Sequence, residues 1–290
     1  MSERTNHDGR QSLDRTVMDT SPKGTTLITG ASSGIGAVYA DRLARRGHDL
    51  LLVARNRDRL DALATRLAEG TGRSVRVIVA DLNDSADLAQ VEQVLRTDPT
   101  ITMLVNNAGI GATAPLLDSD VDAMVRMIDL NVTALVRLTY AIVPAFVQRG
   151  GGTIVNIASA MAIWPELLNG VYGGTKAFVL AFSLSLQKEL TESKIRVQAV
   201  LPGATGTGFW DVAGTPVDQL PSRIVMSAED LVDAALAGLD QGELVTIPSL
   251  PDVAEWDAYE AARQQMLPKL SLSTPAPRYG VPALSVVGGN

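Results

Sequence analysis

Short apolar runs separated by helix-like segments are the feature that most restricts the fold of this chain. Each run is too short for a free-standing helix and lacks the polar alternation of a strand with one face in water. This pattern is typical of parallel strands that are buried on both faces. The runs lie at residues 26–29, 50–54, 75–80, 103–108, 153–158, 197–201 and 244–248.

Amphipathic segments lie between the apolar runs. Ile35, Tyr39 and Leu43 recur every four residues, and residues 60–68 and 177–185 repeat this spacing, which places them on one face of a helix. Strands that alternate with helices predict right-handed crossovers and a parallel sheet between two helical layers. The predicted fold class is therefore α/β, a single-domain, doubly wound Rossmann sheet of about seven parallel strands with helices on both faces.

The chain is expected to divide into three segments. Residues 1–22 are polar, lack the hydrophobic core of a signal peptide and predict a disordered leader. Residues 23–267 predict the Rossmann domain, in which the long segment 203–226 carries glycines, prolines and the aromatic pair Phe209-Trp210, as a lid over a substrate does. Residues 268–290 contain four prolines and no periodicity, and predict an irregular tail.

The charge and residue content exclude several classes of function. A net charge of −7 and an isoelectric point near 4.9 oppose attraction to nucleic acid or to an anionic membrane surface. The chain has no cysteine and only His7 and His48 as histidines, so no metal site is expected. No apolar run reaches the roughly 18 residues of a membrane span, and the longest candidate contains Pro144. We therefore expect a cytoplasmic protein with no nucleic-acid or membrane partner.

Three glycines follow the first apolar run, in the sequence TGASSGIG. Gly30 would permit a sharp turn, Gly34 would let a diphosphate approach the backbone, and Gly36 would allow the next helix to pack closely. In a doubly wound fold this turn lies at the carboxyl end of the first strand, where ligands bind. The spacing predicts a nucleotide site and differs from that of a P-loop phosphotransferase. The alternative is an ordinary strand-to-helix turn.

A tyrosine and a lysine stand four residues apart after the fifth apolar run. Tyr172 and Lys176 would project from one helix face, and Ser159 ends the preceding strand. A phenol with a pKa near 10 is a poor acid-base catalyst at neutral pH, but an adjacent ammonium group stabilises the phenolate and lowers the pKa. Taken alone, such a pair is also common on solvated helix surfaces.

Six motifs occur together and in a characteristic order. They are TGASSGIG (29–36), NNAG (106–109), Asn131 in DLNV, Ser159 in NIASA, YGGTK (172–176) and LPGATGT (201–207). Together they resemble the short-chain dehydrogenase/reductase family, from about Lys23 to Pro248. The resemblance implies a Rossmann-fold enzyme that transfers a hydride between a nicotinamide cofactor and a carbonyl or secondary alcohol.

The resemblance implies four catalytic positions. Tyr172 looks like the general acid and base, and Ser159 like the hydrogen-bond donor to the substrate oxygen. Lys176 would lower the pKa of Tyr172 and hold the nicotinamide ribose, and Asn131 would anchor the water of a proton relay.

The resemblance also implies which residues contact the cofactor. Residues 107–109 would support the adenosine half and the central strand, and Asp81 and Leu82 would contact adenine. Pro202, Gly203 and Thr207 would hold the nicotinamide amide. For Asn107 a purely structural role is the alternative. The implied set is Gly30, Ser32, Ser33, Gly34, Ile35, Gly36, Arg55, Asp81, Leu82, Asn107, Ala108, Gly109, Tyr172, Lys176, Pro202, Gly203 and Thr207.

The end of the second apolar run indicates which cofactor is used. An acidic residue there would pair with a ribose 2′-hydroxyl, whereas an arginine accommodates a 2′-phosphate. The sequence LLLVARNRDRL places Arg55 there and no carboxylate before Asp58, which favours NADP(H). Ser33 stands where some NADP-using members have a basic residue, so Arg55 would act with neutral help from Ser32 or Ser33. Arg57 and Arg59 are expected to enter the next helix.

The expected function is that of an NADP(H)-dependent carbonyl reductase or secondary-alcohol dehydrogenase, as a homodimer or homotetramer. An apolar pocket for hydrophobic or aromatic ketones and aldehydes is predicted from Ile163, Trp164, Leu167, Leu168, Val171, Phe209 and Trp210. The alternatives are a non-catalytic dinucleotide sensor or scaffold, an NAD-dependent alcohol dehydrogenase, and a sugar-nucleotide epimerase or dehydratase.

Overall fold

The computed structural model describes residues 23–281, so the predicted leader and residues 282–290 lie outside the described residues. The chain divides into two compact units, one ending at Pro248 and the other beginning at Ser249. The predicted domain ran on to residue 267, whereas helix α9 (Val253–Met266) falls in the second unit.

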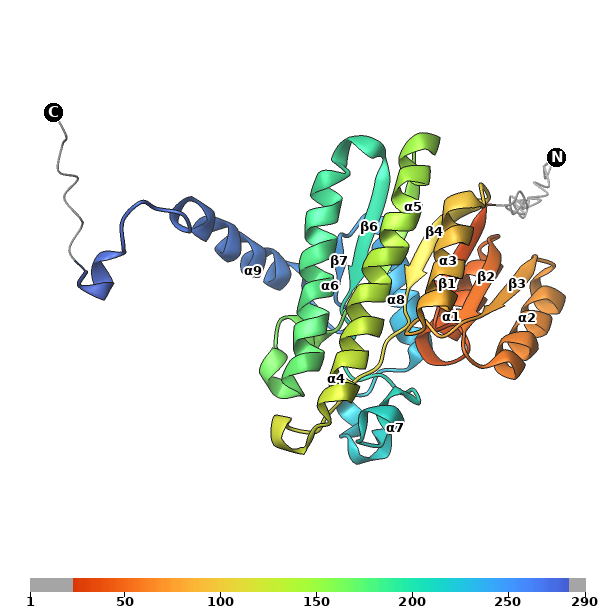
Figure 1. Cartoon of the computed structure of the whole chain (residues 1–290), viewed down its shortest axis with the longest axis horizontal. Coiled ribbons are helices and arrows are strands. Elements are labelled where there is room, and N and C mark those ends of the chain that lie inside the picture. Colours follow the sequence, from red (N-terminus) through yellow and green to blue (C-terminus); the bar gives the residue numbers. More distant parts are fainter. Residues whose placement is uncertain (1–22, 282–290) are drawn as a thin grey trace, which may run out of the picture. The chain divides into compact units, whose positions relative to one another are not determined.

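The first unit contains one sheet of seven parallel strands (Figure 1). The spatial order is β3-β2-β1-β4-β5-β6-β7, so the order reverses between β1 and β4. Each strand overlaps a predicted apolar run, and the predicted fold class is confirmed. The strands are β1 (Thr25–Thr29), β2 (Asp49–Ala54), β3 (Val75–Val79), β4 (Ile101–Asn106), β5 (Gly152–Ile157), β6 (Ile195–Val200) and β7 (Val245–Thr246).

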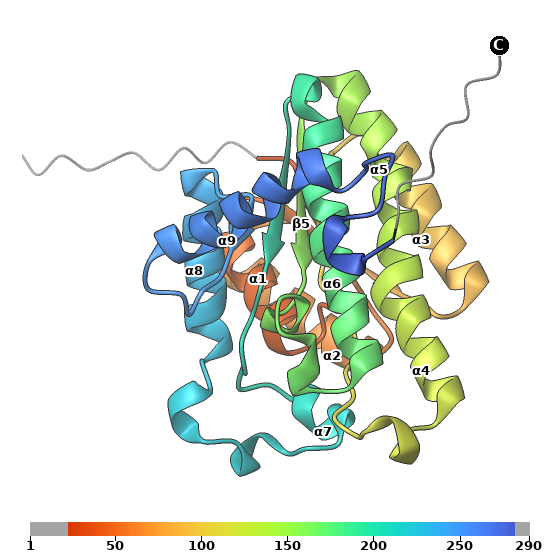
Figure 2. The same cartoon turned by 90° about the vertical axis from the view of Figure 1, so that its left-hand side faces the viewer.

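Helices cover both faces of the sheet (Figure 1, Figure 2). One layer consists of α1 (Gly34–Arg45), α2 (Arg57–Thr71) and α8 (Ala228–Gln241). The opposite layer consists of α3 (Ser85–Thr97), α5 (Leu135–Arg149) and α6 (Gly170–Glu189). Both layers contribute buried apolar side chains to a core, which explains why the strands are apolar without interruption.

The central strand shows how one run serves both cores. Leu27 of β1 pairs with Leu51 and Leu104 on its neighbours, and belongs to the core under α3 and α5. The next residue, Ile28, belongs to the core under α1 and α8. Successive side chains of a strand point to opposite faces, so both must be apolar when both faces are covered.

One long helical stretch departs from the sequence expectation. Helix α4 (Val121–Ile128), a wide π-helical turn (Asp129–Ala134) and α5 run continuously from Val121 to Arg149. Within residues 23–281 this is the one helix long and apolar enough to cross a membrane, with a mean hydropathy of 1.6. The sequence analysis considered only uninterrupted apolar runs, whereas this helix meets the criterion by its length and average composition. In the structure Leu138, Ile142 and Phe146 of this helix are buried against the sheet.

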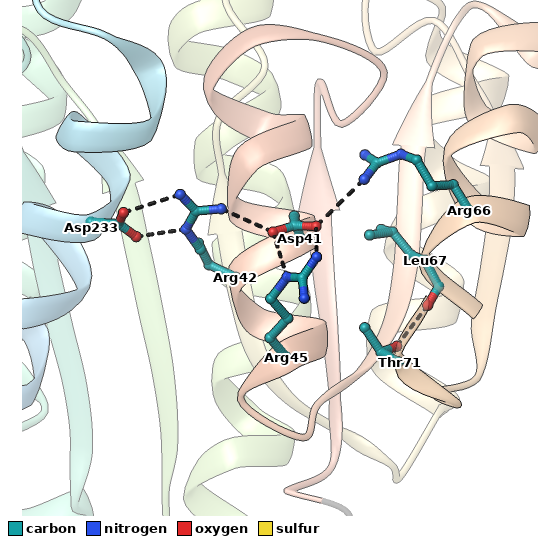
Figure 3. A network of polar contacts seen from close by, with 7 residues as sticks. All are labelled: Asp41, Arg42, Arg45, Arg66, Leu67, Thr71 and Asp233. Atoms are coloured by element: carbon teal, nitrogen blue, oxygen red, sulfur yellow. Dashed lines mark hydrogen bonds and ion pairs between the residues drawn. The ribbon is translucent and has the colours of Figure 1, made fainter. Parts of the chain in front are cut away.

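An ionic network joins α1 to α2 and α8 (Figure 3). Asp41 accepts hydrogen bonds from Arg42 at 2.9 Å and from Arg45 at 3.0 Å, and lies 3.5 Å from Arg66 of α2. Arg42 also pairs with Asp233 of α8 at 2.7 Å. Burial of Asp41 acts to raise its pKa, but the hydrogen bonds from Arg45 and Arg42 outweigh this effect and hold the pKa below its ordinary value. The network therefore links all three helices of this layer.

The described residues of the second unit, 249–281, contain one α-helix and irregular chain with short helical turns. After α9 come two short 3-10 helices, Leu267–Lys269 and Pro277–Tyr279. Within α9 the rings of Trp256 and Tyr259 stack with their centres 5.3 Å apart. The tail predicted to be irregular thus contains short helical turns up to residue 281, and its remainder lies outside the described residues.

Candidate active site

A cleft of about 840 Å³ opens at the carboxyl edge of the sheet. It lies where the strand order reverses, because Gly30 follows β1 and residues 107–109 follow β4. Gly36 and Asn131 were predicted for the site and lie beside the cleft without lining it. The predicted residues that line it are Gly30, Ser32, Ser33, Gly34, Ile35, Arg55, Asp81, Leu82, Asn107, Ala108, Gly109, Ser159, Tyr172, Lys176, Pro202, Gly203 and Thr207.

The glycine turn has the backbone that its sequence predicted. Gly30 and Gly34 adopt φ values of +64° and +53°, the left-handed region that favours glycine. A Cβ atom on Gly36 would lie 2.4 Å from the carbonyl oxygen of Gly30, so α1 packs on the turn as closely as only glycine allows. Ser33 stands at the N-cap of α1, and its side chain makes no capping hydrogen bond within the described chain. The first amide groups of α1 are thus available to an anion.

Asn107 holds the turn in place. Its Nδ2 atom donates to the carbonyl oxygens of Thr29 at 2.9 Å and Gly30 at 3.2 Å. The hydroxyl of Thr29 in turn accepts from the backbone N–H groups of Asn107 and Ala108, both at 3.0 Å. These bonds support the structural alternative for Asn107, which joins the ends of β1 and β4 and also lines the cleft.

Ser159, Tyr172 and Lys176 meet in the cleft, and each is about 6% exposed. The hydroxyl of Ser159 accepts from the N–H of Met161 at 3.1 Å and donates to the carbonyl of Pro202 at 3.4 Å. Lys176 Nζ donates to the carbonyl of Ile157 at 2.9 Å and lies 5.9 Å from the centre of the Tyr172 ring. Helix α6 presents both side chains from one face, as the four-residue spacing predicted.

Burial controls the pKa of both groups on α6. It raises the pKa of Tyr172 to about 12, and the neighbouring Ser159 hydroxyl acts in the opposite direction with a smaller effect. It lowers the pKa of Lys176 to about 8. The pKa of Tyr172 thus lies above its ordinary value in the protein without ligands, and the lowering of this pKa by Lys176 stays a prediction. Burial disfavours the charged form of each group, which is the phenolate of Tyr172 and the ammonium of Lys176.

Asn131 lies in the π-helical turn between α4 and α5. Its side chain accepts from the N–H of Ile110 at 3.0 Å, and donates to the carbonyl of Ile110 at 2.9 Å and to the Thr175 hydroxyl at 3.1 Å. A Cβ atom on Gly109 would lie 3.0 Å from Asn131 Oδ1 and 3.6 Å from Lys176 Nζ. Asn131 thus joins the segment after β4 to α6. Turns of this kind are frequent at functional sites, and no sequence pattern around Asn131 predicted one.

The other end of the cleft is polar and basic. The side chain of Arg55 is 71% exposed, and its Nη1 atom lies 3.9 Å from Asp81 Oδ2. Asn56 and Arg59 also line this end, and the sequence analysis did not include them. Because α2 begins at Arg57, directly after β2, its first turn stays at the edge of the sheet. The short connection from strand to helix is the signal that could have identified Arg59.

The end of the cleft nearer Tyr172 is apolar. Leu168, Phe209 and Trp210 line it as predicted. The other predicted apolar residues do not: Ile163, Trp164 and Leu167 are exposed because short 3-10 turns direct this segment away from the cleft, and Val171 packs beside Met127. The apolar lining residues that the sequence analysis missed include Ile110, Met161 and Val212.

The segment 203–226 has structure of its own. It contains α7 (Phe209–Ala213) and two 3-10 helices, Val217–Gln219 and Ser222–Ile224. Its ends meet in a bridge between Thr205 and Met226. Helix α8 follows directly, and the Ser227 side chain caps it by accepting from the N–H of Asp230.

Comparison with known proteins matches residues 24–216 to the short chain dehydrogenase family. The very-long-chain 3-oxoacyl-CoA reductase of Anas platyrhynchos is 35% identical over 210 residues, which are 70% of this chain and 66% of the duck protein, just under two thirds of its length. The NADP-dependent 3-hydroxy acid dehydrogenase YdfG of Salmonella typhi is 37% identical over 219 residues, covering 72% of this chain and 86% of the relative.

Solved structures agree with these relatives. A short-chain dehydrogenase from Sphingobium yanoikuyae in complex with NADPH has a TM-score of 0.85 and 52% identity, over 88% of this chain and all of that one. The bulky-bulky ketone specific alcohol dehydrogenase from Comamonas testosteroni has a TM-score of 0.81 and 46% identity, over 88% of this chain and 98% of that one. With the matching motifs and the matching fold, this chain belongs to the short-chain dehydrogenase/reductase family of oxidoreductases.

Proposed function

We propose that this protein is an NADP(H)-dependent carbonyl reductase or secondary-alcohol dehydrogenase. The observation that carries the proposal is the convergence of Ser159, Tyr172 and Lys176 in one cleft with the glycine turn. The NADPH complex of the Sphingobium relative and the printed name of the Salmonella relative support the choice of cofactor.

The residues at the carboxyl edge fit a nicotinamide dinucleotide phosphate. The left-handed Gly30 and Gly34 expose backbone beside the uncapped first turn of α1, which suits a diphosphate. Arg55 and Arg59 supply cations where a 2′-phosphate would lie. The bound cofactor supplies the hydride, and the protein supplies binding, orientation and electrostatics.

Three side chains act on the substrate oxygen and on its proton. The Ser159 hydroxyl donates a hydrogen bond to the oxygen, where negative charge develops during reduction. Tyr172 gives this oxygen its proton, and the raised pKa keeps the phenol protonated at neutral pH. The Lys176 ammonium group stabilises the phenolate that remains, and Asn131 fixes the neighbouring main chain at Ile110. A phenol held in its protonated form favours the direction of carbonyl reduction near pH 7.

The apolar end of the cleft supports a hydrophobic or aromatic ketone or aldehyde as the substrate. Ile110, Met161, Leu168 and Phe209 offer it hydrocarbon and aromatic surface. The Comamonas relative, which is specific for bulky-bulky ketones by its printed description, agrees with such a substrate.

Replacement of Tyr172 by phenylalanine tests the catalytic proposal. Tyr172→Phe removes one hydroxyl and little volume, so NADPH binding and thermal stability should persist. Turnover of an aromatic ketone, followed by NADPH oxidation, should fall by about 10²–10⁴-fold, the usual contribution of a general acid. The matched control is Tyr140→Phe, which removes the hydroxyl of a tyrosine that is 70% exposed on α5.

A panel of carbonyl compounds separates this proposal from its alternatives. A sensor or scaffold would bind NADPH without oxidising it in the presence of any ketone. If the Tyr172→Phe variant turned over at a near-normal rate, Tyr172 would not be the general acid. Faster reduction of sugars than of any apolar ketone would overturn the substrate class.

We also propose a homodimer or homotetramer in the cytoplasm. Large apolar side chains on the outer surfaces of α5 and α6, namely Tyr140, Val147 and Phe178, are 70%, 48% and 40% exposed. Apolar groups gathered on the surface of a folded unit are typical of subunit interfaces. Sedimentation equilibrium at micromolar concentration tests the proposal, and a monomer there would contradict it.

A further inference from the structure

The ring of Phe209 lies beside the ring of Tyr172 in the cleft. The two ring centres are 5.8 Å apart and the planes are inclined by 49°. Phe209 is the first residue of α7, and its other neighbour is the ring of Trp210, which meets it edge-on at 5.6 Å. A substrate whose oxygen reaches the Tyr172 hydroxyl must therefore place its carbon substituents close to the Phe209 ring.

A glycine outside the cleft makes room for this ring. Gly111 is buried, and a Cβ atom on it would lie 2.2 Å from Cζ of Phe209 and 3.0 Å from Cε2. Such a distance is far inside van der Waals contact, so alanine at this position and the observed ring cannot coexist. The φ angle of Gly111 lies outside the left-handed region, so its backbone does not require glycine. The Phe209 ring is what requires it.

The helix that carries Phe209 is fixed to the same segment of chain. The backbone N–H and the hydroxyl of Thr113 both donate to the carbonyl of Ala213, at 3.0 and 2.9 Å. The Nε1 atom of Trp210 donates to the carbonyl of Thr205 at 2.9 Å. Both ends of α7 are thus held, so a Cβ atom on residue 111 would require the Phe209 ring to turn about its own side-chain torsions, away from its place beside Tyr172.

We propose that Phe209 is a specificity-determining residue for the carbonyl substrate and that Gly111 is the residue that positions it. The inference deepens the proposed carbonyl reduction and depends on it. The ring offers a flat apolar surface next to the site of proton transfer, and aromatic groups prefer offset or edge-to-face contact with such a ring. The substrate class selected is a ketone with an aromatic substituent on the carbonyl carbon.

A double-mutant cycle on Gly111 and Phe209 tests the proposal with two ketones, propiophenone and butanone. Phe209→Ala should raise KM for propiophenone at least about tenfold, the equivalent of one aromatic contact, and should change KM for butanone by less than about threefold. Gly111→Ala should lower kcat/KM for propiophenone to a similar degree. In the Phe209→Ala background, Gly111→Ala should add no more than about twofold, because the clash has been removed.

Thermal unfolding of the same four proteins gives a readout that is independent of turnover. Gly111→Ala should lower Tm when Phe209 is present and leave it unchanged when Phe209 is alanine. Gly70→Ala is the matched control, because a Cβ atom there meets nothing within 4 Å. Phe209→Leu keeps an apolar group without a ring, so it should preserve the fold of α7 and still lose the preference for propiophenone.

Three results would overturn the proposal in whole or in part. Additive effects of Gly111→Ala and Phe209→Ala on Tm would show that Gly111 does not position the ring. Non-additive Tm values would show that Gly111 makes room for the ring. If Phe209→Ala nevertheless kept the preference for propiophenone over butanone, Phe209 would not determine specificity. A wild-type protein that reduces neither of these ketones but reduces other carbonyl compounds would overturn the specificity role alone, and one that reduces no carbonyl compound of the panel would contradict the proposed function.

Discussion

Arg55 keeps most of its side chain in water, with Asp81 as a distant partner at 3.9 Å. An ion pair this long and exposed contributes little to stability, so the guanidinium group is available to a ligand. Arg57 lies two residues away, is 65% exposed, pairs with Asp61 at 4.0 Å and does not line the cleft. Substitution of Arg55 therefore tests whether its side chain binds the 2′-phosphate of NADP(H), and the same substitution of Arg57 is the control.

The cofactor preference should depend on Arg55. Hydrogen bonds to charged groups contribute roughly 1.5–3 kcal/mol, and 1.4 kcal/mol is tenfold, so wild type should prefer NADPH over NADH at least about tenfold in kcat/KM. Arg55→Asp should reverse the preference, whereas Arg57→Asp should leave it in place. The comparison belongs at low, constant salt because exposed charge contacts are screened. An equal change in cofactor preference in Arg55→Asp and Arg57→Asp would show that the overall positive charge of this region, and not a contact with Arg55, selects NADPH.

The lowered pKa of Lys176 predicts how the rate of reduction depends on pH. Its pKa of about 8 means that the ammonium group loses its proton as the pH rises through that value, while Tyr172, with a pKa of about 12, stays protonated. Reductive kcat/KM should therefore fall above about pH 8. Lys176→Arg keeps its charge throughout this range, so the fall should disappear even where the overall rate is lower. A fall at the same pH in both proteins would assign it to another group.

At the scale of elements, polar residues fix where helices begin and how they join. Asn56 caps α2 through the N–H of Arg59, and Asp84 caps α3. These caps act over three or four residues, so the sequence is sufficient to place them. The Asp41 network acts differently, because its partners Arg66 and Asp233 come from helices distant in sequence.

Loss of the carboxylate from this network should destabilise the first unit. Asp41 is 8% exposed and is shared by three arginines, so Asp41→Asn should lower the free energy of unfolding by about 1–3 kcal/mol at pH 7. The exposed pair partner Asp61 supplies the control Asp61→Asn, for which no measurable change is expected. Urea denaturation followed by circular dichroism measures both variants.

The loss in free energy of unfolding caused by Asp41→Asn should become smaller as the pH falls. The folded-state pKa of Asp41 is lowered, so its stabilisation is complete above the ordinary value of 3.8 and is lost as the pH falls through the folded-state value. Wild type and Asp41→Asn should therefore converge in acid. A constant difference between them down to pH 2 would show that the charge is not the cause.

At the scale of the whole sheet, parallel strands bring distant motifs to one edge. Gly30, Asp81, Asn107, Ser159 and Pro202 follow β1, β3, β4, β5 and β6, and all five line the cleft. Because every strand runs in the same direction, every carboxyl end lies at the same edge. The family resemblance predicted these residues for the site, and the parallel strands explain how they meet although long stretches of chain separate them.

The predictions from sequence failed where the outcome depended on the orientation of irregular segments. The apolar character of residues 163–171 suggested a pocket wall, but 3-10 turns direct Ile163, Trp164 and Leu167 outward. Arg59 was assigned to a helix, which is correct, and it still reaches the cleft. The residue type shows how apolar a side chain is, but the direction in which that side chain points depends on the conformation of the turn.

The sequence by itself determined the strands, the helices, the glycine turn and the family motifs, because buried-strand patterns, caps and glycine conformations act over a few neighbouring residues. Only the tertiary structure decided the raised pKa of Tyr172, the fit of Phe209 against Gly111 and the role of Asn107 in joining two strands. Each of these depends on burial or on distances between segments far apart in the chain, which packing alone establishes.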